Sequence, residues 1–452
     1  MTTVALEFAE FAAGVSTGDL PDTVRHAAKR CLIDWWGGAL AGSVEAPATV
    51  LAEALAPGGG RARLLPWGRG ADPRTAALIN GTAAHTVEVD DIYSPGLYHP
   101  GVAVIAGALA AADHEGVSGA ELLAGIVAGY EVSNRIARTV NPAHYALWHT
   151  TATVGFFGAA AAAGRVLRLD AGRIAHALTT AATFAAGLRH AFSSDAMSKP
   201  LHAGRAAEGG VLAALGARAG LTGVPDMFEG VRGFGAAMSR DVDWGRAGDG
   251  LGTEWTITRM TCKPYPCCGH TFAAIDAARA VMDEGVEPGA IERVGVGTYR
   301  AGVEICENTD PKTPYEAKFS LPYTVALACL NRPVDLAAFA PGGLNDPELR
   351  AMMARVAVAL DPEAEAAFPA LRAAEVAITT RDGRTRRYRQ PTRRGDPDFP
   401  VSDADLGAKF AMLAEPVIGA AAAAETAAAL WRADGLERVG MIPAPERARR
   451  VE

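Results

Sequence analysis

The segment HTVEVDDIYSPGLYHPG, from His85 to Gly101, combines residue types that can move protons. It holds two adjacent carboxylates, Asp90 and Asp91, and it ends in His99 with a Pro-Gly pair behind it. Small residues precede it, and the apolar run 102–112 follows it. A polar, turn-rich segment between two apolar elements is a place where a scaffold can present acid and base groups to a cleft. We therefore predict that it forms half of an active site, although a solvated connecting loop would also carry an Asp pair.

A second histidine, His149, stands directly before the apolar run 150–167, where a helix is predicted to begin. The first amide groups of a helix have no partners inside it, and the helix dipole is positive there. This position favours a neutral imidazole and suits an anionic ligand. The alternative interpretation is that His149 only caps the helix or packs against Trp148.

Lysine is rare in this chain, since only six of the 43 basic residues are lysines. Among so many arginines, a lysine indicates a position that requires a compact ammonium group. Lys199 lies in the segment SKPLH, which ends in His202 and opens an alanine-rich helix, and Lys263 lies in CKPYP. A lysine whose charge simply reaches the solvent is the alternative for each position.

Together these residues predict a pocket for a polycarboxylate. Three segments at helix starts each bring a histidine or a lysine, and Lys263 adds a cation from the junction of two predicted domains. Cations would neutralise carboxylate groups and stabilise the negative charge that develops when a proton on the neighbouring carbon is removed. A histidine or an aspartate would move that proton.

Composition excludes several other classes of function. The net charge of −8 gives no support for nucleic-acid binding, which requires a basic face. The longest run without a charged residue or histidine, 150–164, is too short to cross a bilayer, and the N-terminus lacks the basic start of a signal peptide. Six cysteines in 452 residues do not form a disulfide framework, so we expect a protein of the reducing cytoplasm that contacts no membrane.

One group of residues raises the question of a metal site. Cys262, Cys267, Cys268 and His270 lie close in sequence, but their spacing is unlike that of zinc or iron–sulfur sites. Adjacent cysteines are also awkward as ligands of a single ion. We therefore interpret the group as a turn with buried thiols and predict no metal there.

The elements around these residues predict a mostly α fold. Apolar residues at helical spacing recur through the first 260 residues, where helices are predicted at 22–40, 48–55, 74–85, 103–114, 119–140, 151–167, 171–188 and 202–219. Alternating runs then predict strands at 291–300, 355–360, 374–380 and 385–389, with an Asp-Gly hairpin turn at 382–383 and helices at 271–284, 321–330 and 346–354. Residues 403–430 are helical again. We predict a large all-helical domain, 1–260 with 403–452, and an inserted smaller α+β domain, 261–402, that can act as a lid.

Longer motifs resemble those of a known family. They are NGTAAHTVEVDD with YHPG, LWHTTATVGFF, MSKPLHAGRAAEGG, CKPYPCCGHTFAAIDAA, EAKFSLPYTVALA and GDPDFPVSDADLGAKF. With these motifs the chain resembles the MmgE/PrpD family, which includes 2-methylcitrate dehydratases, cis-aconitate decarboxylases and iminodisuccinate epimerases. The resemblance implies a homodimer that binds a di- or tricarboxylate without a metal or organic cofactor.

The same resemblance implies roles for the positions that match the family's motifs. The acid-rich segment and its histidine, the helix-start histidine and the two lysine segments imply catalytic roles for Asp90, Asp91, His99, His149, Lys199 and Lys263. The implied substrate-binding residues are His202, the lid tyrosine Tyr323 and Tyr145, whose placement resembles the epimerase-like branch. Ile92 and Glu88 depart from the family pattern, because many members have Thr or Ser after the Asp pair and the decarboxylase-like pattern has Asp at position 88.

We therefore expect a cofactor-independent lyase, specifically a hydro-lyase that acts on a 2-methylcitrate-like hydroxy acid. Lys199 and Lys263 would hold carboxylates, His99 or His149 would act as acid or base, and Asp90 or Asp91 would orient the imidazole. One alternative is an epimerase of an iminodisuccinate-like dicarboxylate, and another is a cis-aconitate-type decarboxylase. A non-catalytic dimeric scaffold or carboxylate-binding regulator is an alternative of a different class.

Overall fold

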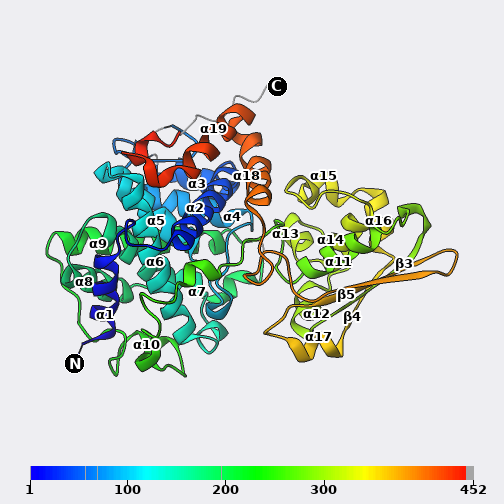
Figure 1. The fold of residues 1–452 in the computed structure, drawn as a ribbon, viewed down its shortest axis with the longest axis horizontal. Coiled ribbons are helices and arrows are strands. Elements are labelled where there is room, and N and C mark those ends of the chain that lie inside the picture. Colours follow the sequence, from blue (N-terminus) through cyan, green and yellow to red (C-terminus); the bar gives the residue numbers. More distant parts are fainter. Residues whose placement is uncertain (1, 56, 69, 195, 444–452) are drawn as a thin grey trace. The chain divides into compact units, whose positions relative to one another are not determined.

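The computed structural model describes residues 2–55, 57–68, 70–194 and 196–443. The chain divides into two compact units, shown in Figure 1. Unit 1 comprises Met1–Thr261 and Asp403–Glu452, so it contains both ends of the chain. Unit 2 comprises the inserted residues Cys262–Ser402.

Unit 1 is built from helices that approach one another closely. Its helices are α1 (Val4–Gly14), α2 (Asp22–Ser43), α3 (Ala46–Leu55), α4 (Pro73–Thr86), α5 (Gly101–Glu115), α6 (Gly119–Val140), α7 (Thr150–Val166), α8 (Ala171–Ala182), α9 (Ser198–Arg218), α10 (Phe234–Met238), α18 (Asp403–Ile418) and α19 (Ala420–Trp431). Small residues make the approach possible: a Cβ at Gly204 of α9 would lie 2.1 Å from the Leu78 carbonyl oxygen of α4. This crossing brings the end of α4 beside the start of α9, and both carry candidate residues.

Unit 2 contains a four-stranded sheet in the order β4-β3-β5-β6. Its strands are β3 (Ile291–Thr298), β4 (Val356–Leu360), β5 (Ala374–Thr380) and β6 (Thr385–Gln390), and only the β3–β4 pair is parallel. Its helices are α11 (Phe272–Met282), α12 (Arg300–Cys306), α13 (Pro314–Lys318), α14 (Leu321–Cys329), α15 (Pro341–Leu344), α16 (Pro347–Met353) and α17 (Pro362–Ala367). Buried residues of α11, α14 and α16 share one core with β3 and β5.

The predicted fold class, mostly α with an inserted α+β unit, is confirmed. One small correction concerns unit 1, whose described residues also include a short antiparallel pair, β1 (Ala62–Arg63) with β2 (Gly70–Ala71). Among the described residues, no helix is both long and apolar enough to cross a membrane.

Two helix boundaries near the candidate residues differ from the prediction. Helix α8 ends at Ala182 instead of continuing to 188, and the connection to α9 contains the 3-10 segment Arg189–Phe192. Helix α9 begins at Ser198 and not at position 202, because proline is tolerated within the first helical turn, where its missing N–H is not required. Lys199 therefore lies in the first turn of α9.

A buried ion pair ties the C-terminal part of unit 1 to the loop that carries the acid pair. The Lys409 ammonium of α18 donates to Asp34 Oδ1 of α2 at 2.5 Å and to the Val89 carbonyl oxygen at 2.7 Å. The Lys409 and Asp34 side chains are 6% and 4% exposed. Because Val89 directly precedes Asp90, Lys409 helps to fix the position of that carboxylate.

Removal of either charge should destabilise unit 1. Lys409→Ala or Asp34→Ala takes a buried charge away from its counter-ion, which costs about 3–5 kcal/mol, whereas a double variant without either charge should regain part of that loss. Urea unfolding followed by circular dichroism measures the effect. Lys29→Ala, which breaks the more exposed pair with Asp434, is the control and should cost about 1 kcal/mol or less. Equal losses in Lys409→Ala and in this control would contradict the assignment.

Candidate active site

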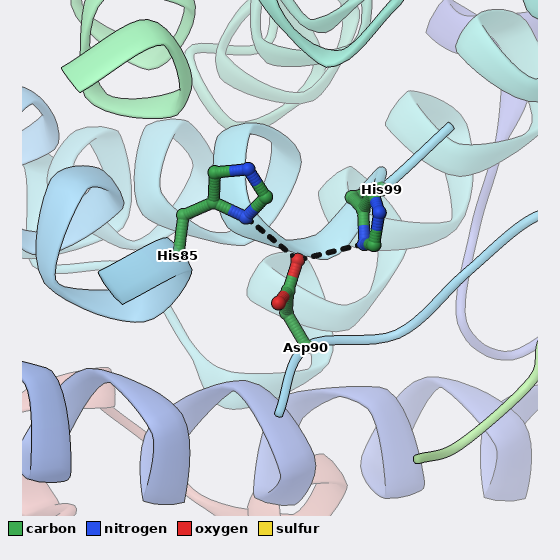
Figure 2. Close-up of side chains that lie close together, drawn as sticks. All are labelled: His85, Asp90 and His99. Carbon is green, nitrogen blue, oxygen red and sulfur yellow. Dashed lines mark hydrogen bonds and ion pairs between the residues drawn. The ribbon is translucent and has the colours of Figure 1, made fainter. Parts of the chain in front are cut away.

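Asp90 lies between two imidazoles. Its Oδ2 lies 2.8 Å from His85 Nδ1 and 2.8 Å from His99 Nδ1. Figure 2 shows the carboxylate of Asp90 between the two rings. His85 comes from the last turn of α4, Asp90 from the following loop and His99 from the residues just before α5. The exposed fractions of the three side chains are 0%, 3% and 20% in chain order. A carboxylate buried to this extent requires donors, and each imidazole supplies one when its Nδ1 carries the proton. We call these residues the His-Asp-His triad.

The triad determines what His99 can do. With Nδ1 turned to Asp90, the other ring nitrogen, Nε2, lies on the far side of a partly exposed ring. A carboxylate on Nδ1 fixes the tautomer and the orientation of an imidazole and stabilises its charged form. The backbone N–H of His99 also donates to Thr151 Oγ1 at 3.2 Å, which ties the start of α5 to the start of α7. These contacts fix the position and orientation of the His99 ring, as the role of a general acid or base requires.

Asp91 has different contacts from Asp90. Its Oδ1 accepts the Gly101 N–H at 3.1 Å, at the start of α5, and its Oδ2 accepts the Tyr130 hydroxyl at 2.7 Å. Burial, together with the nearby charges of Asp34 and Asp90, raises the pKa of Asp91 to about 7. The sequence predicted a catalytic role for either acid, but these contacts are those of a residue that caps a helix.

His149 and His202 form a second imidazole pair, with their Nδ1 atoms 3.1 Å apart. Burial is the main cause that lowers the pKa of His149 far below its ordinary value, and it lowers the pKa of His202 to about 4. Both rings are thus neutral at pH 7, and one Nδ1–H donates to the other Nδ1. His85 links the pair to the triad, because its ring centroid lies 5.6 Å from that of His149 and 5.3 Å from that of His99. The four imidazoles form a continuous row.

Lys199 supplies a cation to the same region. Its ammonium forms an ion pair with Glu88 and lies 5.4 Å from the centroid of the Phe192 ring. Phe192 in turn meets the His149 ring edge-on at 4.8 Å, and the charge of Lys199 contributes to the low pKa of His149. Glu88 has a φ of 63°, a left-handed conformation that costs energy for a residue other than glycine and that recurs at functional sites.

Tyr145 packs near Phe192 and Arg189. The two ring centroids are 6.5 Å apart, and the Arg189 guanidinium carbon lies 4.6 Å from the centroid of the Tyr145 ring. Tyr145 and His149 thus both have ring contacts with Phe192. A direct contact between Tyr145 and a substrate stays a prediction.

Lys263 and Tyr323 belong to unit 2, whereas the residues above belong to unit 1. Lys263 is 3% exposed and lies just after Thr261, the residue whose backbone pairs with Ile92 directly after the acid pair. Tyr323 is buried in α14, and its hydroxyl donates to the Ala338 carbonyl oxygen at 2.5 Å. The Tyr323 hydroxyl is thus already bonded within its own unit. The roles predicted for both residues stay predictions.

The cysteine group near Lys263 has the contacts of buried thiols. Cys267 is fully buried, its Sγ lies 3.2 Å from Thr271 Oγ1, and burial raises the pKa of its thiol to about 12. His270 Nδ1 lies 2.6 Å from the Tyr299 hydroxyl. A thiol that stays protonated is a poor metal ligand, because metals bind the thiolate.

The triad is the place among the described residues where ligand atoms lie close enough together to hold a metal ion, within 4.8 Å of one another. His85 Nδ1 and Asp90 Oδ2 form a hydrogen bond of 2.8 Å, and His99 Nδ1 lies at ion-pair distance from the same oxygen, also 2.8 Å. Two ligand atoms of a tetrahedral zinc ion would lie roughly 3.3 Å apart. We therefore interpret the triad as a hydrogen-bonded group.

A cavity of about 530 Å³ lies between α4 and α9, on the side where His202 reaches its lining. Its floor is apolar and includes Leu78 and Leu201. Its two arginines, Arg74 and Arg205, both pair with Glu208, and the lining also includes the carboxylate of Asp72. The two arginines and two carboxylates of the lining balance one another in charge.

Comparison with known proteins identifies the class to which this fold and site belong. Residues 6–247 match the MmgE/PrpD N-terminal domain, and residues 265–433 match the MmgE/PrpD C-terminal domain. The chain belongs to the MmgE/PrpD family, as its motifs indicated.

Curated relatives extend over most of the chain. The cis-aconitate decarboxylase of Homo sapiens is 27% identical over 428 residues, which cover 91% of this chain and 87% of the relative. The enzyme of the same name from Mus musculus is 29% identical over 364 residues, 76% of this chain and 73% of the relative. That of Aspergillus terreus is 26% identical over 319 residues, 66% of this chain and 63% of the relative.

The sequence analysis missed two side chains of the site. His85 opens the segment from which the prediction began, but nothing in the pattern distinguished it from other helix-end residues. Its distance of five positions from Asp90, across the end of a helix, was the available signal. Phe192 was missed because it lies in the predicted connection between 188 and 202, where no motif distinguished it.

The raised pKa of Asp91 predicts how stability depends on pH. Since the ordinary pKa of an aspartate is 3.8 and that of Asp91 in the folded protein is about 7, the folded chain keeps a proton that the unfolded chain has lost between these values. Stability therefore falls as pH rises through this range and levels off above it. Asp91→Asn cannot ionise, so from pH 5 to pH 8 it should lose about 2–3 kcal/mol less than the wild type. Urea unfolding at both pH values tests this, with the surface variant Asp19→Asn as a control that follows the wild type. Parallel curves for the wild type and Asp91→Asn would refute it.

Proposed function

We propose that this protein is a lyase that acts on a tricarboxylate and that its reaction is decarboxylation of a cis-aconitate-type substrate. The observation that carries the proposal is the row of four imidazoles beside Lys199, with the buried Asp90 carboxylate behind His99. The names of the relatives support the choice of decarboxylation over the hydro-lyase reaction that the sequence first suggested.

The chemistry requires a cation and a proton donor. When the bond to the departing carboxylate breaks, its electron pair stays on the substrate while carbon dioxide leaves. Delocalisation into a neighbouring carboxylate spreads this charge, and an ammonium group such as that of Lys199 stabilises it. The imidazolium form of His99, supported by Asp90, would then donate its Nε2 proton to carbon.

The remaining residues bind substrate in this proposal. A substrate carboxylate would share the Lys199 ammonium with Glu88 or replace Glu88 there, and Lys263 would hold a second carboxylate. The neutral His149–His202 pair offers hydrogen bonds without adding charge, and Tyr145 and Tyr323 would contact the substrate. We also propose that the protein acts as a homodimer and requires no cofactor.

Dehydration of a 2-methylcitrate-like hydroxy acid is the second candidate. It is favoured by Glu88, because the decarboxylase-like pattern has an aspartate at this position. The same cluster suits that reaction, since a proton donor next to a cation can assist the departure of hydroxide.

One assay separates these reactions. The protein is incubated in deuterated water with cis-aconitate, 2-methylcitrate, citrate and other di- and tricarboxylates, and NMR follows each acid. Release of carbon dioxide with one deuteron on the product carbon is the expected result, and treatment with EDTA should leave the rate unchanged. Loss of water would support the second candidate, and exchange of a proton for deuterium without other change would indicate an epimerase. No change in any acid would contradict the proposal.

The two lysines provide the mutational test. Lys199→Ala and Lys263→Ala should each lower kcat/KM by about 10²–10³-fold, because each removes a charge that stabilises the developing anion. Circular dichroism should show unchanged folding. Lys312→Ala is the matched control, since this lysine of unit 2 is 70% exposed, and it should keep wild-type activity. Near-normal kcat/KM in both test variants would reject the assigned pocket.

A further inference from the structure

We propose that His85 is a positioning residue that holds Asp90 in place and, through Asp90, fixes the orientation and tautomer of His99. This inference deepens the proposed function and rests on it for its kinetic readout. It assigns a task to a buried side chain that the reaction scheme above does not use.

The first argument is the sharing of one carboxylate oxygen. His85 Nδ1 and His99 Nδ1 both lie 2.8 Å from Oδ2 of Asp90. Asp90 lies in a loop, and if only His99 held its carboxylate, the Asp90 side chain could still rotate. A second donor on the same oxygen removes that freedom, and such outer partners commonly fix the tautomer of a functional histidine.

The second argument concerns which of the two imidazoles is the rigid one. His85 is fully buried near the end of α4, where Gly81 meets Gly204 of α9 so closely that a Cβ at Gly81 would lie 3.0 Å from the Gly204 Cα. His99, by contrast, keeps 20% of its side chain exposed. The helix therefore fixes His85, His85 fixes Asp90, and Asp90 orients His99.

The third argument is the state of the second ring nitrogen of His85. Its Nε2 is buried and has no hydrogen-bond partner within the described part of the chain. A buried N–H without an acceptor would be costly, so the proton belongs on Nδ1, where Asp90 accepts it. The ring faces of His85 and His149 are nearly parallel, with an angle of 20° between them, and the His99 ring meets that of His85 at 61°.

Several charged or titratable groups surround His85. Asp90 and His99 face it from the loop and from α5, His149 from α7, and Lys199 and His202 act on the same region from α9. The Asp34–Lys409 pair lies behind the loop, at Val89.

Two substitutions separate positioning from packing. In His85→Asn the side-chain amide takes the place of Nδ1 and keeps the donor to Asp90, but the ring is lost. In His85→Phe the ring is kept and the donor is lost. We expect His85→Phe to lower kcat/KM by about 10–100-fold and to move the alkaline limb of its pH profile to higher pH, because Asp90 loses one donor and its charge then acts more strongly on the His99 imidazolium. His85→Asn should retain most of the activity and the wild-type pH profile. Active His85→Phe with inactive His85→Asn would show that only packing matters, and two active variants would show no role.

A readout that needs no turnover keeps this inference separate from the proposed function. NMR of protein labelled in its histidine side chains, with His99→Gln for assignment, reports the tautomer of His99. We expect the Nδ1–H form in the wild type and in His85→Asn, and a mixture of tautomers in His85→Phe. Should His85→Phe not fold, His85→Gln replaces it, because its amide reaches the Nε2 position and leaves Asp90 without the donor. A His99 tautomer that is the same in every variant overturns the inference, even if the wild type turns out to act on none of the acids tested.

Discussion

A carboxylate buried between two imidazoles is the constraint on which the rest of the site depends. Asp90 is 3% exposed, so it is tolerated only where donors reach it, and His85 and His99 do so at the same oxygen. Contacts of the neighbouring residues fix the position of the loop. Lys409 donates to the Val89 carbonyl oxygen on one side of Asp90, and Asp91 on the other side caps α5. The C-terminal helices, which lie far from this loop in sequence, thus contribute to its geometry.

Helix ends bring the remaining groups together. His99 lies two residues before α5, His149 directly precedes α7, and Lys199 lies in the first turn of α9. Such ends can meet only if the helices pack closely, and glycines at the α4–α9 crossing permit this. Burial then keeps the His149–His202 pair neutral, so that the cationic character of the region comes from Lys199 rather than from all its imidazoles. A site with one fixed cation and several neutral donors suits an anionic substrate whose charge shifts during the reaction.

The sequence was most informative where a residue pattern is compatible with only one type of structure. Helical periodicity and the change to alternating residues predicted the mostly α fold with an α+β insertion; the sequence places that insertion at 261–402, and the structure places it at Cys262–Ser402. The candidates of unit 1 could be named because histidine and lysine at helix starts are few. The different roles of Asp90 and Asp91 could not be predicted, because a sequence does not show in which direction each of two adjacent side chains points. The roles of His85 and Phe192 could not be predicted either, because they depend on contacts between segments that are distant in sequence.

The most direct test of this account is a crystal structure of the protein with propane-1,2,3-tricarboxylate, which has neither a double bond nor a hydroxyl group and should therefore bind without reacting. The account predicts one carboxylate on the Lys199 ammonium and another part of the molecule within hydrogen-bond distance of His99 Nε2, with Asp90 still between its two imidazoles. A ligand bound only in the cavity beside Leu78 and Leu201, or a metal ion in place of the hydrogen bonds of the triad, would contradict it.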